Sequence, residues 1–269
     1  MSDSFGSVAI VGAGQVGTML GLALRAAGAS REITIFDRDA DVAARSVARG
    51  AAHRVAHRLE LGADVVILAL PVSAIVRLLD QSGVEVRPGA LLIDTGSAKA
   101  RIVGAMRALP TGVHAIGGHP LAGTERAGPD GADPGALRGA AFALCPVRDD
   151  PEALRRAGQL VAAVGARPVV IGADEHDRIV ARTSALPHLL AFALARSAGR
   201  AGDITSLAAS GYRGATRLAH SDPAMVAAFL AANAAETRAA VAELREALDD
   251  LVACLDDEHA LATALAEPR

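Results

Sequence analysis

The fold of this chain is decided by Val8-Ala9-Ile10-Val11-Gly12-Ala13-Gly14-Gln15-Val16-Gly17. Four apolar residues, typical of a buried parallel strand, run into a glycine turn, and apolar residues at helical spacing follow from Met19. In such a unit the first glycine permits the tight turn, the second lets a diphosphate approach the backbone, and the third lets the helix pack on the strand. The pattern predicts that a dinucleotide binds at Gly12, Gly14, Gln15, Val16 and Gly17, where the helix N-terminus attracts its diphosphate.

A second predicted strand, residues 32–36, ends at Asp37, which follows Gly17 by 20 positions. A carboxylate at this distance suits a hydrogen bond from a ribose 2′-hydroxyl and repels a 2′-phosphate, whereas the neighbouring Arg38 is able to accept that phosphate. We therefore expect NAD as the cofactor, with NADP less favoured. The alternative is a glycine-rich turn in an unrelated α/β protein.

Composition limits the classes of protein that this chain can belong to. Its 269 residues are 51% apolar, enough for one large or two medium domains, and the net charge of −3 includes no basic block. We therefore expect no nucleic acid and no membrane among its partners. The polar start of the chain predicts no signal peptide, hence a cytoplasmic location in which Cys145 and Cys254 are reduced, buried side chains.

Short apolar segments alternate with helical ones over the first two thirds of the chain, which indicates a parallel sheet covered on both faces. From residue 173 onward only helical periodicity remains. We expect an α/β fold: a Rossmann-type doubly wound parallel sheet over 1–172, then an all-α domain over 173–269 that binds substrate and forms a dimer. Further strands are predicted at residues 63–70, 90–94, 113–118, 140–144 and 167–171.

The C-terminal part is expected to contain a long helix that starts at Ser221-Asp222-Pro223, with Asp222 as the N-cap and Pro223 in the first turn. Leu244, Leu248, Leu251 and Leu255 follow as one apolar stripe on it. The stripe could pack within its own domain or against a second subunit. Residues 124–139 are predicted to form a long loop.

Several residues that could carry chemistry follow predicted strands, at the edge where such sheets bind ligands. His119 comes directly after the strand at 113–118 and is a candidate general base. Ser97 and Lys99 follow the strand at 90–94, where they could orient that histidine and neutralise substrate charge. Lys99 is the single lysine among 27 basic residues, which suggests a site that arginine does not fit. Leu70 and Pro71 are expected to line the dinucleotide site.

Two further candidates lie in the helical part. His188 falls on an early helix, and Arg217 could clamp a carboxylate by two parallel hydrogen bonds. No set of histidines has metal-ligand spacing, so we expect no metal.

Taken in order, five groups of residues resemble the prephenate/arogenate dehydrogenases of tyrosine biosynthesis, and the resemblance covers nearly the whole chain. They are Gly12 to Gly17, Asp94 to Lys99, Gly117 to Glu125, Glu175 to Asp177 with Ser184 to His188, and Thr216-Arg217 with Ser221-Asp222-Pro223. The resemblance implies a Rossmann domain, a helical domain that forms a homodimer, and oxidative decarboxylation of a cyclohexadienol with NAD. We expect no regulatory domain after Arg269.

The same resemblance implies roles for individual residues. His119 would be the catalytic histidine, with Ser97 supporting it near the nicotinamide. Arg217 would bind a substrate carboxylate, and the other substrate residues would be His188, Lys99, Thr124, Glu125 at the entrance and Asp177. The chain departs from the family where Ala185 replaces a second histidine and Val226 a tryptophan, which leaves open prephenate, arogenate or an amino-substituted analogue.

Two alternatives belong to other classes. A β-hydroxyacid dehydrogenase resembles this plan but uses a lysine in its second domain, and no lysine follows Lys99. A non-catalytic dinucleotide-binding protein would have no need of His119, Ser97, His188 and Arg217 together.

Overall fold

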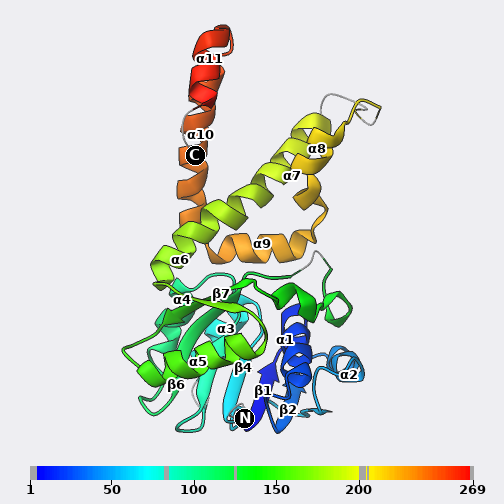
Figure 1. The fold of residues 1–269 in the computed structure, drawn as a ribbon, viewed down its shortest axis with the longest axis vertical. Helices are drawn as coiled ribbons and strands as arrows, with labels where there is room; N and C mark the ends of the chain where they lie inside the picture. The colour runs from blue at the N-terminus through cyan, green and yellow to red at the C-terminus, as the bar shows by residue number, and fades with distance from the viewer. Residues whose placement is uncertain (1–4, 82–84, 124–125, 200–203, 205, 267–269) are drawn as a thin grey trace. The chain divides into compact units, whose positions relative to one another are not determined.

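The computed structural model describes residues 5–81, 85–123, 126–199, 204 and 206–266 (Figure 1). The chain forms two compact units. The first consists of Met1–Asp177 and His220–Ala232, and the second of Arg178–Ala219 and Asn233–Arg269. The chain therefore passes from the first unit to the second, returns for 13 residues and leaves again.

The first unit is built on an eight-stranded sheet in the order β3-β2-β1-β4-β5-β6-β7-β8. Helices flank the sheet (Figure 1). Its strands are β1 (Ser7–Val11), β2 (Glu32–Phe36), β3 (Arg54–Val55), β4 (Val65–Leu68), β5 (Leu91–Asp94), β6 (His114–Pro120), β7 (Ala141–Pro146) and β8 (Arg167–Val170). Its helices are α1 (Gln15–Ala26), α2 (Ala40–Ala48), α3 (Val72–Leu79), α4 (Ala100–Met106), α5 (Pro151–Ala163) and α9 (Pro223–Ala232), with α6 (Ala173–Val180) starting here.

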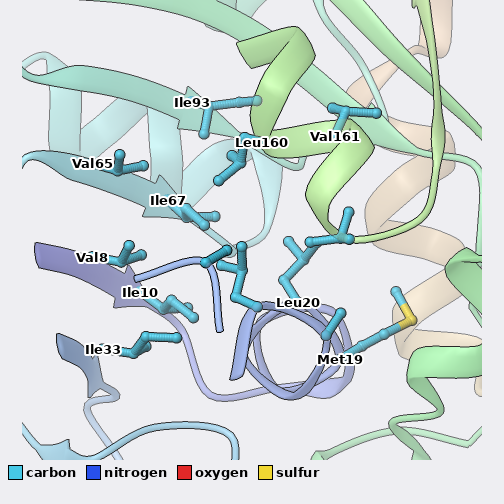
Figure 2. Close-up of a cluster of buried hydrophobic side chains, with 14 of the residues drawn as sticks. Val8, Ile10, Met19, Leu20, Ile33, Val65, Ile67, Ile93, Leu160 and Val161 are labelled. Atoms are coloured by element: carbon cyan, nitrogen blue, oxygen red, sulfur yellow. The ribbon is translucent and has the colours of Figure 1, made fainter. Parts of the chain in front are cut away.

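Alternate residues of β1, β4 and β5 enter two separate cores, because side chains of a strand point to opposite faces. On one face Val8 and Ile10 of β1 pack with Met19 and Leu20 of α1 and with Leu160 of α5 (Figure 2). On the other face the core contains the remaining strand residues with α3 and α4. Burial on both faces explains why these strands read as continuous apolar runs. The doubly wound fold expected from the sequence is confirmed.

One pair of strands differs from the wholly parallel sheet expected above. β6 and β7 are antiparallel, with His119 opposite Ala143, while the other pairs are parallel. A parallel return needs a crossover, usually an α-helix on a sheet face. In the described part of the connection the chain forms only the short 3-10 helices η1 (Pro129–Gly131) and η2 (Pro134–Leu137), within the predicted loop 124–139.

The structure also changes the context of His119. The predicted strand at 113–118 extends through Pro120, so His119 lies within β6 rather than after it. The ladder to β7 sets this length, and periodicity within one segment does not reveal that pairing. The two-residue edge strand β3 was not predicted.

The second unit contains a long helical run interrupted by a π-helical turn. α6 leads into this turn, η3 (Ala181–Ala185), which is followed by α7 (Leu186–Ala198). Pro187 has no backbone N–H to donate to the preceding turn, which is a usual cause of such an irregularity. α8 (Ser210–Ala215) and η5 (Arg217–His220) come next along the chain.

The single long helix predicted from Pro223 is wrong in its extent. The chain forms α9, then α10 (Ala234–Ala253), then α11 (Glu258–Leu265). Asn233, with φ −121° and ψ 38°, breaks the run, and Asp257 caps α11. The predicted start is right, since Asp222 accepts a hydrogen bond from the Met225 N–H at 2.8 Å.

The leucine stripe is largely uncovered. Leu248 is 54% exposed and Leu255 is 63% exposed, whereas Leu244 and Leu251 are half-buried. Leu255 follows the end of α10 rather than lying on it. Among the described residues, no helix is both long enough and apolar enough to cross a membrane.

Candidate active site

The glycine turn between β1 and α1 has the geometry that its sequence predicts. Gly12 adopts φ +106°, and a Cβ there would lie 2.1 Å from the carbonyl oxygen of Ala69. A Cβ on Gly17 would lie 1.9 Å from the carbonyl oxygen of Gly12. Neither position tolerates a side chain. A Cβ on Gly14, by contrast, would meet nothing within 4 Å, so the backbone there is open to a bound group.

Asp37 stabilises the same turn from the end of β2. One carboxylate oxygen accepts a hydrogen bond from the Ala13 N–H at 2.8 Å, and the other accepts one from the Asp39 N–H at 3.0 Å. Each oxygen retains acceptor capacity for a further donor. Arg38 is exposed.

A cavity of about 730 Å³ lies at the carboxyl ends of the parallel strands, within the first unit. Gly14, Gln15 and Val16 line it after β1, Leu70 and Pro71 after β4, and Ser97 after β5. His119 of β6 lines the same cavity, together with Met225 and Phe229 of α9. Residues far apart in the sequence are thus brought to one hollow at the edge where α/β sheets bind ligands.

His119 is the first member of a chain of three hydrogen-bonded side chains. Its Nδ1 lies 2.9 Å from Nε2 of His176, and Nδ1 of His176 lies 2.8 Å from Oδ1 of Asp177. Asp177 in turn accepts the backbone N–H groups of Lys99 at 2.7 Å and Ala100 at 2.9 Å. His176 and Asp177 are buried, so this chain is fixed beneath the cavity.

The bonding pattern fixes which nitrogen of His119 can accept a proton. Burial raises the pKa of Asp177, but hydrogen bonds from His176 and two backbone N–H groups outweigh it and lower that pKa. An ionised Asp177 only accepts, so Nδ1 of His176 carries its proton. When the ring of His176 is also neutral, its Nε2 accepts the proton of His119 Nδ1. Nε2 of His119 then carries a free lone pair, and it has no hydrogen-bond partner among the described residues.

Burial lowers the pKa of His119 well below its ordinary value of 6.5, and the positive charge of Lys99 lowers it further. The imidazole is therefore neutral at physiological pH. A neutral imidazole with one uncommitted nitrogen in a cavity is the form that a general base requires.

Lys99 does not take the position expected of a substrate-binding residue. It is fully buried (0% exposed) and does not line the cavity. Its ammonium bonds to a carboxylate oxygen of Asp94 and, at 2.6 Å, to the carbonyl oxygen of Gly118. A buried ammonium must be paired, and Asp94 is the carboxylate within its reach. Lys99 thus joins β5 to β6 beneath His119.

Asp94 completes this buried pair. Its two oxygens also accept the backbone N–H groups of Gly96 at 2.7 Å and Gly118 at 3.0 Å. Both strand ends that carry Ser97 and His119 are therefore held by one ion pair.

The remaining predicted residues fall into three groups. Thr124 and Glu125 lie outside the described residues. His188 and Arg217 belong to the second unit, where His188 Nδ1 lies 2.9 Å from the carbonyl oxygen of Ser184 and Arg217 is exposed on η5. Ala185 and Val226 are both buried, and Val226 does not line the cavity although Met225 does.

Two residues of the site were not predicted. His176 lies within the Glu175 to Asp177 group, but the sequence gives it no role, because its partner His119 lies 57 positions earlier in the chain. The one feature of the sequence that could have pointed to His176 is the Glu175-His176-Asp177 motif itself. Arg101, in the first turn of α4, lines the cavity and was overlooked among 26 arginines. The described residues contain no group of three or more His, Cys, Asp or Glu side chains able to hold a metal ion.

The cysteines are separate from this site. Cys145 is buried in the second core, and burial raises the pKa of its thiol to about 12, which keeps it protonated and inert. Cys254 is only half-buried, so the prediction of two buried cysteines is right for Cys145 alone.

Residues 20–170 match the nucleotide-binding domain of prephenate dehydrogenase, and residues 172–266 match its dimerization domain. The chain belongs to the prephenate dehydrogenase family. The glycine turn precedes the first of the two matched ranges.

Three members of this family and its relatives show the range of similarity. A prephenate dehydrogenase of Lactococcus lactis is 32% identical over 84% of this chain, which spans 64% of that protein. A 4-amino-4-deoxyprephenate dehydrogenase of Streptomyces pristinaespiralis is 36% identical over 49% of this chain and 42% of its own length. The prephenate dehydrogenase of Aquifex aeolicus, solved with hydroxyphenyl propionate and NAD⁺, has a TM-score of 0.91 at 25% identity, covering 99% of this chain and 97% of that one.

Proposed function

We propose that this protein catalyses the NAD-dependent oxidative decarboxylation of prephenate or arogenate, giving 4-hydroxyphenylpyruvate or tyrosine. The observation that supports this most directly is the uncommitted Nε2 of His119 in the cavity that Gly14 also lines. His119 can act as the proton acceptor, and the backbone at Gly14 can hold a diphosphate. A dehydrogenase of this kind needs both functions in one cavity.

The residues of the glycine turn suit a dinucleotide. The open face of Gly14 and the N-terminus of α1 at Gln15 would hold the diphosphate, and Asp37 would accept a ribose hydroxyl. Leu70 and Pro71 line the cavity beyond β4 and would contact the nicotinamide half. When bound, NAD supplies the acceptor for a hydride from C4 of the cyclohexadienol ring.

His119 would take the proton of the C4 hydroxyl as the ring carboxylate leaves as CO₂. Aromatisation provides the driving force, so the protein mainly has to orient the ring and remove this proton. His176 and Asp177 are positioning residues, because they hold His119 in the tautomer with an accepting Nε2. Ser97 lines the cavity beside it and would support the same hydroxyl.

The substrate's carboxylates require cationic partners. Arg217 of the second unit would bind one of them, and His188 would contact the substrate, as in the family pattern. Asp177 would hold the site together through its bonds to the backbone of Lys99 and Ala100, and the family pattern assigns Thr124 and Glu125 to substrate binding as well.

The decisive experiment is a spectrophotometric assay of NADH formation with prephenate and with arogenate, each offered NAD and NADP. We expect turnover of at least one substrate with NAD. A protein that binds NAD but forms no NADH with either substrate would be a non-catalytic dinucleotide-binding protein instead.

A second candidate substrate is 4-amino-4-deoxyprephenate. The streptomycete relative named for this compound has the highest identity of the three described, 36%, although the match covers only 49% of this chain. His119 would face the C4 substituent of either compound, so the same assay with the amino compound distinguishes the candidates. Faster turnover of the amino compound than of prephenate and arogenate would favour this second function.

We predict that NAD is preferred over NADP and that Asp37→Ser narrows the preference. The substitution removes a negative charge that would repel a 2′-phosphate, and it leaves the exposed Arg38 to accept that phosphate. The ratio of kcat/KM for the two cofactors measures the effect. Asp41→Ser, an exposed acidic change in the first turn of α2, is the matched control and should leave the ratio unchanged. Equal use of NADP by the unchanged protein would contradict the prediction.

We also propose that the protein is a cytoplasmic homodimer. Residues 172–266 match a dimerization domain, and Leu248 and Leu255 are exposed on the second unit. Obligate interfaces commonly bury more than about 2,000 Å² of largely apolar surface. Sedimentation at micromolar concentration should therefore show a dimer.

Leu248→Asp should shift that equilibrium toward monomer, because it places a charge in the apolar interface. Glu246→Gln, two positions earlier and about 200° around α10, is the control that should keep the dimer. A monomer of the unchanged protein would exclude the proposed dimer.

A further inference from the structure

A second cavity lies at the opposite edge of the sheet from His119. It has a volume of about 450 Å³ and is lined by four arginines and a single carboxylate: Arg31, Arg87, Arg155, Arg156 and Asp64. Phe5, Gly6 and Gln159 complete its wall. All of these residues belong to the first unit. We call it the arginine pocket.

The topology of the sheet assembles this pocket. Arg31 directly precedes β2, Asp64 directly precedes β4 and Arg87 lies shortly before β5. Because these strands are parallel, their amino ends meet at one edge, while the dinucleotide cavity lies at their carboxyl ends. α5, packed on the sheet, adds Arg155 and Arg156. The arginine pocket is thus separate from the candidate active site.

Positive charge is in excess in the arginine pocket. Asp64 accepts hydrogen bonds from the Ser7 N–H at 2.8 Å and the Ser7 hydroxyl at 2.7 Å, which lower its pKa to about 2, and it also pairs with Arg87. Glu152 pairs with Arg155 from outside the lining, at 2.6 Å and 2.8 Å. The two carboxylates therefore leave two of the four positive charges uncompensated.

Two of the arginines show how the pocket is arranged. Arg156 is held in place by the backbone, because its guanidinium donates to the carbonyl oxygens of Gly89 at 2.7 Å and Asp64 at 3.0 Å. Burial lowers its pKa, and Arg155 and Arg87 lower it further against the opposing effect of Glu152 and Asp64. Arg31 has no side-chain partner among the described residues. The guanidinium of Arg156 is thus fixed by hydrogen bonds and lies near other positive charges, whereas that of Arg31 is available to bind a ligand.

We propose that the arginine pocket binds a small polyvalent oxyanion, one that carries two or more phosphate or carboxylate groups. Guanidinium groups donate in planar pairs that match the oxygens of both, and such charge-assisted bonds are stronger than neutral ones. The volume exceeds that of a single phosphate, and the nearly all-polar wall does not suit an apolar ligand. The bound anion would supply the negative charge that the pocket lacks.

Calorimetric titration of the full chain with pyrophosphate, and separately with citrate, tests the proposal. We expect one site for at least one of the two anions, with an affinity that falls as salt is added. Tighter pyrophosphate binding identifies a phosphate ligand, and tighter citrate binding a carboxylate ligand. No binding of either anion at millimolar concentration would overturn the proposal.

Variants distinguish this site from the dinucleotide cavity. Arg31→Gln should weaken binding about tenfold or more, because it removes charge-assisted hydrogen bonds without breaking a contact of the fold. Arg77→Gln, an exposed change on α3, should have no effect. Gly14→Asp, for which the turn has room, should repel a diphosphate from the glycine turn but leave the arginine pocket unchanged. Binding that survives Arg31→Gln and is lost in Gly14→Asp would show that the anion occupies the glycine turn instead.

Discussion

His119→Asn should lower kcat by on the order of 10²–10⁴, the usual contribution of a positioned general base. Asparagine keeps a polar side chain of similar reach but cannot accept the hydroxyl proton. The apparent affinity for substrate should change little, because we assign that affinity mainly to Arg217. Steady-state kinetics with the preferred substrate and NAD measure both quantities.

Two further substitutions show whether the effect is specific. His114→Asn changes a histidine on the same strand, but one that pairs with Asp150 at 2.9 Å outside the cavity, and it should leave kcat unchanged. Arg217→Ala should raise KM with little change in kcat, since a carboxylate clamp acts alike in the ground and transition states. Full turnover by His119→Asn would show that another group takes the proton.

The pH profile provides an independent check on His119. A general base is active when neutral, so the rate falls as pH drops through its pKa. Because burial and the charge of Lys99 lower that pKa well below 6.5, the rate should stay level through neutral pH and fall only in more acidic solution. The acidic limb should be absent from any residual activity of His119→Asn. A limb centred above 6.5 would contradict the described environment of His119.

Lys99→Met should destabilise the protein by about 3–5 kcal/mol, the usual cost of leaving a buried charge without its partner. Lys99 and Asp94 both have side chains that are 0% exposed, so water cannot replace the lost ammonium. For a chain of this size we expect the thermal midpoint to fall by on the order of 10 °C. Thermal and urea unfolding measure the change.

The double variant Lys99→Met with Asp94→Asn is the matched control, because it removes both charges. It should be more stable than Lys99→Met alone, since an uncharged amide costs less to bury than an unpaired carboxylate. If the free energy of unfolding of Lys99→Met lay within about 1 kcal/mol of the parent value, the buried pair would contribute no more than an exposed surface pair does.

Local pattern in the sequence was sufficient for much of the fold. The apolar run before Gly12 and the spacing to Asp37 predict a strand, a turn, a helix and a second strand, and the structure has them there. These signals succeed because a buried parallel strand and a glycine turn each depend on residues that are adjacent in the chain. The start of α9 at Pro223 was predictable for the same reason.

Other features depended on pairing between distant segments. The extension of β6 to Pro120 and its antiparallel pairing come from β7, and the break at Asn233 falls where the chain leaves the first unit. Helical periodicity continues across Asn233, so it does not reveal that α9 and α10 belong to different units. Periodicity reports the faces of one segment and contains no information on its partners.

The candidate site shows the same division. The sequence by itself predicted His119, Ser97 and the glycine turn as site residues, because each belongs to a compact motif near the end of a strand. Only the tertiary structure placed His176 against His119, buried Lys99 against Asp94 and gathered four arginines at the opposite edge. The physical reason is that a proton acceptor, a buried ion pair and a charged pocket each depend on distances in space, and these residues come from elements that are separated along the chain.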